Sequence, residues 1–287
     1  MSGTPIIFDA RLLALRRRRA AVMAMSGADF LLRHAADEIA ERLAAVNRRF
    51  EQAADLGTPG GALAARLRAS QQIGAIAPVD WETTGGGETL PLPPARLDLA
   101  VSALALHTVN DLPGLFLQIR RTLRGDGLFL AILPGGETLI ELREALTSAE
   151  SAERGGAAPR IAPSADLRAV GTLLQRAGFA LPVVDTDRLT ARYDTMFDLV
   201  RDLRAMGAGN ILIDRDARPL TRAIAARAAA IYAERFSDRD GRIRATFDLI
   251  SVSAWAPHES QPKPLKPGSA TTRLEDAVVA IRREGEG

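Results

Sequence analysis

The segment that follows the apolar stretch 50–54 is a near-complete glycine turn, Asp55-Leu56-Gly57-Thr58-Pro59-Gly60-Gly61. An acidic residue and alternating glycines, on a turn from a strand into a helix, let a ligand approach the backbone closely. Pro59 takes the middle glycine position, where its fixed φ and missing N–H remove a contact that glycine would offer. The turn predicts a Rossmann-like sheet, with Asp55, Gly57 and Gly61 as candidate cofactor contacts. The Asp55 carboxylate could instead bond only to N–H groups of its own turn.

His107 is a second candidate for chemistry. It follows the apolar stretch 97–106, near the expected carboxyl end of a strand, where open α/β sheets bind their ligands. An imidazole at that edge could contact a cofactor or act as a general base near neutral pH. A histidine in an apolar stretch can also be a hydrogen-bonded structural group, so both interpretations stay open.

The motif Gly135-Gly136-Glu137-Thr138 follows the predicted strand 128–133 and precedes a helix. We expect Glu137 and Arg143 to contact a substrate at the mouth of the pocket, and Glu141 to be a second candidate catalytic base. The two acidic side chains would suit a substrate arginine. Acidic residues also favour the first turn of any helix because of its dipole, so a structural role is equally open.

The composition excludes several classes of chemistry. The chain of 287 residues has no cysteine, which rules out disulfides, thiolate catalysis and cysteine-ligated metals. His34 and His258 show no spacing that suggests a metal site with His107, and we expect none. The net charge of +2 gives no argument for a nucleic-acid partner.

The sequence also bears on location. No uncharged apolar run reaches the roughly 18–20 residues of a membrane span. At the N-terminus the charges follow the apolar residues, which is the reverse of a secretory signal. We therefore expect a cytoplasmic protein.

Strands and helices alternate after residue 50, which is the pattern of a parallel sheet. The apolar periodicity predicts strands at 50–56, 97–103, 128–133, 181–185 and 247–256, and helices at 63–69, 112–123, 138–153, 165–177, 196–206 and 219–236. We expect an α/β fold with a seven-stranded sheet closed by an antiparallel pair. The expected organisation is a helical segment at 1–49, one domain at 50–257, and an extended proline-containing tail at 258–287.

Several motifs together resemble one protein family. They are Phe8-Asp9 with the arginines 16–19, Asp55-Leu56-Gly57, the segments 102–113, 135–143 and 196–207, and the tail segments 258–261 and 267–270. In this order, over nearly the whole length, they resemble the methyltransferase-like complex I assembly factors of mitochondria and their alphaproteobacterial relatives. A weaker similarity extends to the methyltransferase that caps malonyl carrier protein in biotin synthesis.

The resemblance implies a class I methyltransferase fold, S-adenosylmethionine as cofactor, and a protein client such as a subunit of respiratory complex I. The first functional hypothesis is a methyltransferase-like enzyme of complex I assembly. The second is hydroxylation of an arginine on a complex I subunit, the activity assigned to the mitochondrial family member. The third is an assembly factor that kept the fold and lost the cofactor.

The segment between Gly61 and Asp98 is short for this fold, at 36 residues. Two helices, two strands and their loops need roughly 45 residues at typical lengths, so an element has been shortened or lost. In a methyltransferase the second strand ends in the carboxylate that holds the ribose hydroxyls. Asp80 and Glu82 are the nearby candidates, and neither follows a convincing strand. We take Asp80 as the candidate cofactor contact.

Three further features remain open on sequence alone. The arginines 16–19 could form a solvated helix face or touch an anionic membrane surface peripherally. A Met/aromatic stripe at Tyr193, Met196, Phe197 and Met206 could cover the cleft or belong to the core. The tail and the segment 137–143 could jointly recognise a protein client, or the tail could only cover the domain's own surface.

Overall fold

The computed structural model describes residues 5–84, 87–216 and 218–262. The chain divides into two units, residues 1–257 and 258–287. The tail features at 263–287, including the motif 267–270, lie outside the described residues. No described helix has the length and apolar character that crossing a membrane requires.

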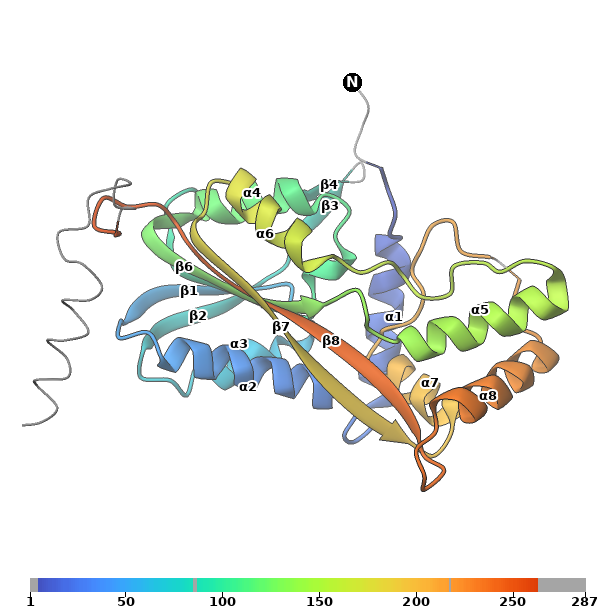
Figure 1. The fold of residues 1–287 in the computed structure, drawn as a ribbon. Helices are drawn as coiled ribbons and strands as arrows, with labels where there is room; N and C mark the ends of the chain where they lie inside the picture. Colours follow the sequence, from blue (N-terminus) through green and yellow to red (C-terminus); the bar gives the residue numbers. More distant parts are fainter. Residues whose placement is uncertain (1–4, 85–86, 217, 263–287) are drawn as a thin grey trace, which may run out of the picture. The chain divides into compact units, whose positions relative to one another are not determined.

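The first unit is built on a six-stranded mixed sheet (Figure 1). Its strand order is β2-β1-β5-β6-β8-β7, in which the first four strands run parallel and β8 runs antiparallel to both of its neighbours, β6 and β7. This confirms the Rossmann-like class I methyltransferase fold with its antiparallel closing pair. The strands are β1 (Phe50–Leu56), β2 (Ile73–Val79), β5 (Leu97–Ala103), β6 (Leu123–Pro134), β7 (Ala180–Tyr193) and β8 (Ile243–Trp255).

Helices cover both faces of the sheet. Helices α2 and α3 pack on one face, and α4 and α6 on the other (Figure 1). Helices α5, α7 and α8 extend the first side, where α5 and α8 pack against β8 and α7 packs against β7. The helices are α1 (Ala10–Met23), α2 (Phe30–Ala44), α3 (Ala62–Leu67), α4 (Leu112–Thr122), α5 (Ile140–Arg154), α6 (Leu167–Arg176), α7 (Met196–Ala205) and α8 (Arg222–Phe236).

The residues before these helices explain where several of them begin. Asp or Thr side chains accept a hydrogen bond from a first-turn N–H of α1, α4, α6, α7 and α8. Such caps satisfy backbone donors that have no partner within the helix. At the other end, α5 stops at Gly155, which has a φ of 73° that glycine adopts without strain.

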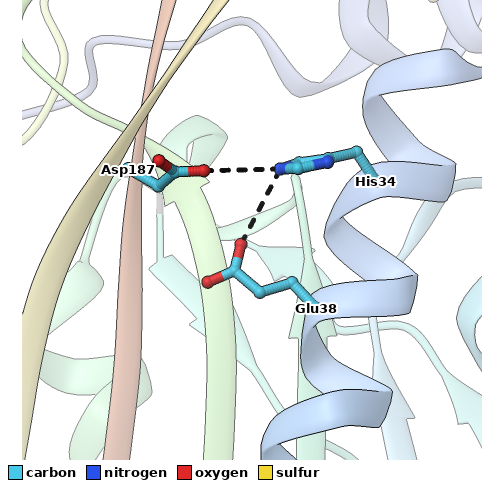
Figure 2. A group of neighbouring side chains, drawn as sticks. All are labelled: His34, Glu38 and Asp187. Atoms are coloured by element: carbon cyan, nitrogen blue, oxygen red, sulfur yellow. Dashed lines mark ion pairs between the residues drawn. The ribbon is translucent and has the colours of Figure 1, made fainter.

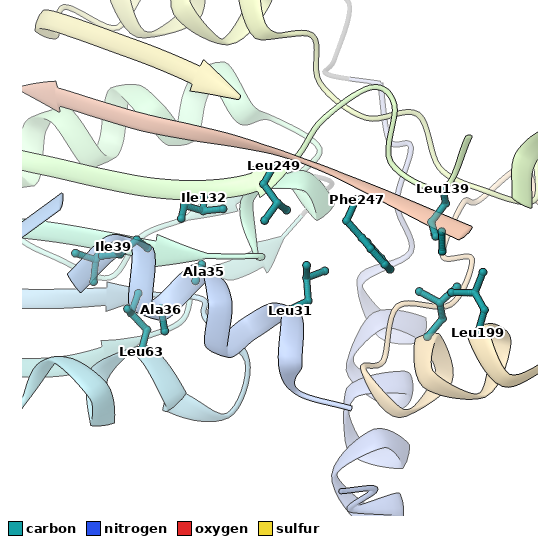
Figure 3. Close-up of a cluster of buried hydrophobic side chains, with 14 of the residues drawn as sticks. Leu31, Ala35, Ala36, Ile39, Leu63, Ile132, Leu139, Leu199, Phe247 and Leu249 are labelled. Carbon is teal, nitrogen blue, oxygen red and sulfur yellow. The ribbon is translucent and has the colours of Figure 1, made fainter. Parts of the chain in front are cut away.

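Apolar residues with different periodicities build the two sides of the core. On α2, Leu31, Ala35 and Ile39 recur at helical spacing and face the sheet (Figure 3). Strand β5 is buried along its whole length, and its side chains alternate between the two faces. Leu99 faces the α2 side and Ala100 the α4 side, so one continuous apolar run contributes to both layers.

The main departure from the predicted fold lies between residues 62 and 97. Instead of a seven-stranded sheet, the described residues form six strands and a separate two-stranded hairpin, β3 (Glu82–Thr84) and β4 (Gly87–Thr89). The hairpin stands where a second helix and an outer strand were expected. The prolines at 91, 93 and 94 lack the N–H groups that a further ladder would need. The prediction that an element is missing here agrees with this arrangement.

Candidate functional site

A cleft of about 1400 Å³ opens beside the carboxyl ends of the parallel strands. Its floor includes residues from the ends of β1, β2, β5 and β6, and helices α1 and α7 line the other side. Ligands of open α/β sheets bind at this edge. The predicted candidates Asp80 and His107 both line it, together with Thr58, Pro59 and Gly60 of the turn.

The glycine turn has the backbone conformation that its sequence predicts. Gly57, Gly60 and Gly61 have φ values of 68°, 67° and 64°, in the region that side chains disfavour. Pro59 opens a single 3-10 turn, η1 (Pro59–Gly61), and faces the cleft. A Cβ on Gly57 would lie 2.4 Å from the ring of Trp81, so the indole packs directly on this glycine. Gly57 and Gly61 do not line the cleft themselves.

Asp55 lies under the turn. One carboxylate oxygen accepts a hydrogen bond from the N–H of Ala64 in α3 at 3.0 Å. The other oxygen is buried and has no hydrogen-bond partner among the described residues. Burial raises the pKa of Asp55 to about 6, although its hydrogen bonds act in the opposite direction. The side chain ties the turn to α3 and does not reach the cleft wall.

Asp80 directly follows β2, a strand that the sequence did not reveal. Its side chain lines the cleft, and no ion pair or hydrogen bond joins its carboxylate to a described residue. Arg17 of α1 also lines the cleft, and its pKa is lowered by burial, an effect that nearby Asp80 opposes. Asp80 therefore lies at the end of the second strand of the chain, with its side chain at the cleft.

His107 lies in a single 3-10 turn, η2 (Leu106–Thr108), just after β5. Its Nδ1 atom is buried and has no hydrogen-bond partner among the described residues. Burial, and secondarily the Arg17 guanidinium, lowers the pKa of His107 to about 4. The ring is therefore neutral at pH 7, with an open acceptor or donor for a ligand.

The buried imidazole predicts a pH dependence of stability. Between its folded pKa of about 4 and the ordinary value of 6.5, the unfolded chain binds the proton more readily. Stability is thus lost as pH falls through this window, by about 2 kcal/mol between pH 7 and about pH 4.5. Asp55 has the opposite slope, because its pKa is raised.

We expect His107→Gln to flatten this decline relative to the natural protein. The measurement is urea unfolding of both proteins at about pH 7 and about pH 4.5. Because Asp55 is unchanged in both, its contribution cancels in the comparison. Parallel pH profiles for the two proteins would show that His107 is not held in its neutral form.

The candidates of the 137–143 segment are placed differently from the prediction. Glu141 is buried, and its carboxylate accepts hydrogen bonds from the backbone N–H and the hydroxyl of Thr246 in β8. It does not line the cleft, so the geometry gives it a structural role and not that of a base. The reason is that the first turn of α5 lies against β8, which sequence periodicity could not show.

Glu137 and Arg143 also lie outside the cleft lining. Glu137 is exposed. Arg143 donates weak hydrogen bonds to the carbonyls of Gly136 and Thr138, at 3.3 and 3.4 Å, and borders a smaller cavity of about 350 Å³. Of this segment, Thr138 and Leu139 reach the main cleft.

The Met/aromatic stripe divides between core and cleft. Tyr193 is buried in the core, and Met196 is buried but also borders the cleft. Phe197 is 54% exposed and lines the cleft, as does Met206. Helix α7 therefore forms one wall of the cleft with its outer residues and packs into the core with its inner ones.

Arginines in the cleft are the feature that the sequence did not reveal. Arg16 and Arg17 of α1 line the cleft with Arg204 of α7, and none of the three makes an ion pair with a described carboxylate. Burial, and then the neighbouring Arg215, Arg19 and Arg204, lower the pKa of Arg16. The run 16–19 is thus only partly a solvated face. Arg16 and Arg17 face the cleft because α1 packs on α7, and the local sequence does not specify that packing.

The chain is similar in sequence to proteins of known families. A family model described as "Methyltransferase domain" matches residues 62–131. The chain is 38% identical over 264 residues to the rat mitochondrial arginine-hydroxylase NDUFAF5, covering 86% of this chain and 76% of that protein. It is 36% identical over 199 residues to the malonyl-[acyl-carrier protein] O-methyltransferase of Xylella fastidiosa, covering 69% and 65% of the two chains.

The crystal structure of the YcgJ protein from Bacillus subtilis shares the fold. Its TM-score is 0.51 at 14% identity, with 76% of this chain and 97% of that chain covered. The predicted cytoplasmic location is contradicted by the sequence relatives, since the NDUFAF5 proteins are named as mitochondrial. On the sequence and fold together, the chain belongs to the NDUFAF5 family, within the class I methyltransferase superfamily.

Proposed function

We propose that the protein is an S-adenosylmethionine-dependent, methyltransferase-like factor that acts on a protein client during assembly of respiratory complex I. The observation that carries this proposal is the cleft, which combines the glycine turn after β1 with an unpartnered Asp80 at the end of β2. Membership of the NDUFAF5 family and the methyltransferase domain match support it.

The residues of the cleft fit this cofactor in part. Asp80 would accept hydrogen bonds from the ribose hydroxyls, and the turn at 58–60 would approach the methionine part. His107 would contact the adenosine or, as a neutral imidazole, accept a proton from the acceptor group. The bound cofactor supplies an electrophilic methyl group on a sulfonium centre. The chain's own residues would align the acceptor and exclude water.

The arginine-hydroxylase name of the relatives favours a second candidate, hydroxylation of an arginine on a complex I subunit. A substrate guanidinium in this cleft would meet Asp80 as an unpaired carboxylate, while Arg16, Arg17 and Arg204 would repel it. Glu137 and Glu141 do not line the cleft, so they give this reading less support than the sequence suggested.

One experiment separates the three functional hypotheses. The full chain is incubated with methyl-labelled S-adenosylmethionine and purified complex I subunits, in the presence of dioxygen and a two-electron reductant, and the subunits are analysed by mass spectrometry. A labelled methyl group on a subunit supports the proposal. A gain of one oxygen on an arginine supports the hydroxylase. Binding of a subunit with neither change supports a non-catalytic assembly factor, and no binding contradicts all three.

Pro59 is expected to weaken cofactor binding. Pro59→Gly restores a backbone N–H at the cleft wall, and one added hydrogen bond contributes about 0.5–1.5 kcal/mol. We therefore expect S-adenosylmethionine to bind about 2- to 10-fold more tightly to the variant, measured by calorimetry. Thermal unfolding of the variant without cofactor is the control. Glycine gives the unfolded chain more conformational entropy than proline does, so the substitution can also lower the stability of the fold. Equal or weaker binding would mean that proline does not impair the turn.

Client recognition by the tail is a separate proposal. We propose that the tail 258–287 and the exposed face around Glu137 and Arg143 jointly contact the client. Full-length protein and a variant truncated before His258 are compared in a pull-down from cells that contain complex I. Loss of complex I subunits from the truncated form supports the role of the tail. Equal recovery by both forms, or no recovery by either, contradicts it.

A further inference from the structure

A polar stripe runs along the edge of helix α2 that faces strands β7 and β8. His34, Glu38 and Arg42 follow one another at four-residue spacing and therefore share one side of the helix. They flank the buried row of Leu31, Ala35, Ile39 and Leu43. The stripe is consequently half-buried between the core and the surface, where polar groups need partners.

Strand β7 presents its polar residues to this stripe. Asp185 and Asp187 are two residues apart in the strand, so they point to the same face. They pair with Ser251 and Leu249 of β8, and Leu249 belongs to the core on the α2 side. The topology thus brings acidic side chains that are about 150 residues away in the chain against α2.

One end of the stripe is fully satisfied. Arg42 donates to both oxygens of Asp185, at 2.8 and 2.9 Å, and also to Oε1 of Glu38. The hydroxyl of Ser251 donates to the same Oε1 atom at 2.7 Å. Glu38 is therefore held in place through one oxygen, and its other oxygen, Oε2, is directed away from these partners.

At the other end of the stripe, two buried polar atoms lack hydrogen-bond partners among the described residues. The Nε2 atom of His34 lies 4.0 Å from Oε2 of Glu38 and 3.6 Å from Oδ2 of Asp187 (Figure 2). His34 Nε2 and Glu38 Oε2 are both buried, yet neither has a hydrogen-bond partner among the described residues. A direct ion pair with hydrogen bonding would place these atoms about 2.7–2.9 Å apart. An imidazole nitrogen and two carboxylate oxygens instead surround a common point, with all three within 4.8 Å of one another.

We propose that His34, Glu38 and Asp187 form a binding site for a divalent transition-metal ion that clamps α2 to β7. Zinc binds imidazole nitrogen and carboxylate oxygen at about 2.0–2.2 Å, so ligands around it lie about 3–3.5 Å apart. Small rotations, chiefly of the 57% exposed Asp187, bring the three atoms to this separation. The contacts of Arg42 and Ser251 to Glu38 act as the outer support that metal ligands commonly have.

The chemistry of the three donor groups indicates which metal ions the site would bind. One imidazole with two carboxylates, and no thiolate, suits zinc, manganese or ferrous iron. None of the three residues lines the cleft, so the site is separate from the proposed cofactor site. Three protein ligands on a partly exposed site leave a position for water.

The test is calorimetric titration of zinc ions into the chelator-treated full-length chain. The chain has three histidines and no cysteine, so few competing ligands exist. We expect one site per chain, and an affinity at least about tenfold lower in His34→Gln and in Asp187→Asn. His258→Gln is the matched control and retains the natural affinity. Ser251→Ala, which removes only support of Glu38, is expected to lower the affinity about tenfold.

Circular dichroism shows whether each variant is folded. If His34→Gln fails to fold, Asp187→Asn decides the question, because its exposed side chain can be changed without disturbing the core. Absence of zinc binding by the natural protein, or unchanged affinity in the folded His34 or Asp187 variant, overturns the site. In that case the three side chains form only an ion-pair cluster.

Discussion

Replacing Asp80 by alanine is expected to weaken S-adenosylmethionine binding by about 10- to 100-fold. The carboxylate lines the cleft at the end of β2 and has no partner among the described residues, so it is available to a ligand. A hydrogen bond to a charged group contributes about 1.5–3 kcal/mol, and about 1.4 kcal/mol corresponds to a factor of ten in affinity. The measurement is calorimetric titration of the full-length variant.

Glu82→Gln is the matched control for this prediction. Glu82 lies two residues further along the chain, is exposed, and does not line the cleft. We expect it to leave cofactor affinity unchanged. Equal affinities for the Asp80 and Glu82 variants would contradict the role of Asp80 at the ribose.

The second large effect concerns the fold. Phe129→Ala is expected to lower the free energy of unfolding by about 3–5 kcal/mol. Phe129 is fully buried in β6, stacks on Phe179 at 5.6 Å and meets Phe116 edge-on at 6.0 Å between ring centroids. The variant would leave a cavity between the sheet, α4 and the segment after α6.

Urea unfolding of the natural protein and two variants tests this prediction. Phe197→Ala is the control, because Phe197 is 54% exposed and its loss should change the free energy of unfolding by less than about 1 kcal/mol. A loss below about 1 kcal/mol for Phe129→Ala would show that this aromatic cluster does not stabilise the α4 face.

Sequence patterns predicted the central strands well because burial constrains them on both faces. The predicted bounds of β1 and β5 agree with the structure, since mostly apolar runs ended by turn residues are typical of a buried parallel strand. Strand β2 was not predicted, because burial constrains few of its residues. It lies at the edge of the sheet, buries little beyond Ile73 and Ile76, and contains Gly74 and Pro78, which disfavour strands.

Site residues could be predicted only where they directly follow a strand that the sequence itself predicts. The glycine turn and His107 follow strands that the sequence marks, so their place at the sheet edge could be inferred. Glu141 was misread because its partner, Thr246, lies 105 residues away and takes its carboxylate out of the cleft. The cluster of His34, Glu38 and Asp187 depends on a similar long-range contact. Only the four-residue spacing of His34 and Glu38 was visible in the sequence.

The most direct measurement is calorimetric titration of S-adenosylmethionine into the full-length natural protein. We predict one binding site per chain with a Kd above about 1 μM, because the cleft retains Asp80 and Gly60 while Pro59 removes a backbone donor. A submicromolar Kd would show that Pro59 does not weaken the site. Absence of any binding at millimolar cofactor would contradict the proposal that this cleft is a cofactor site.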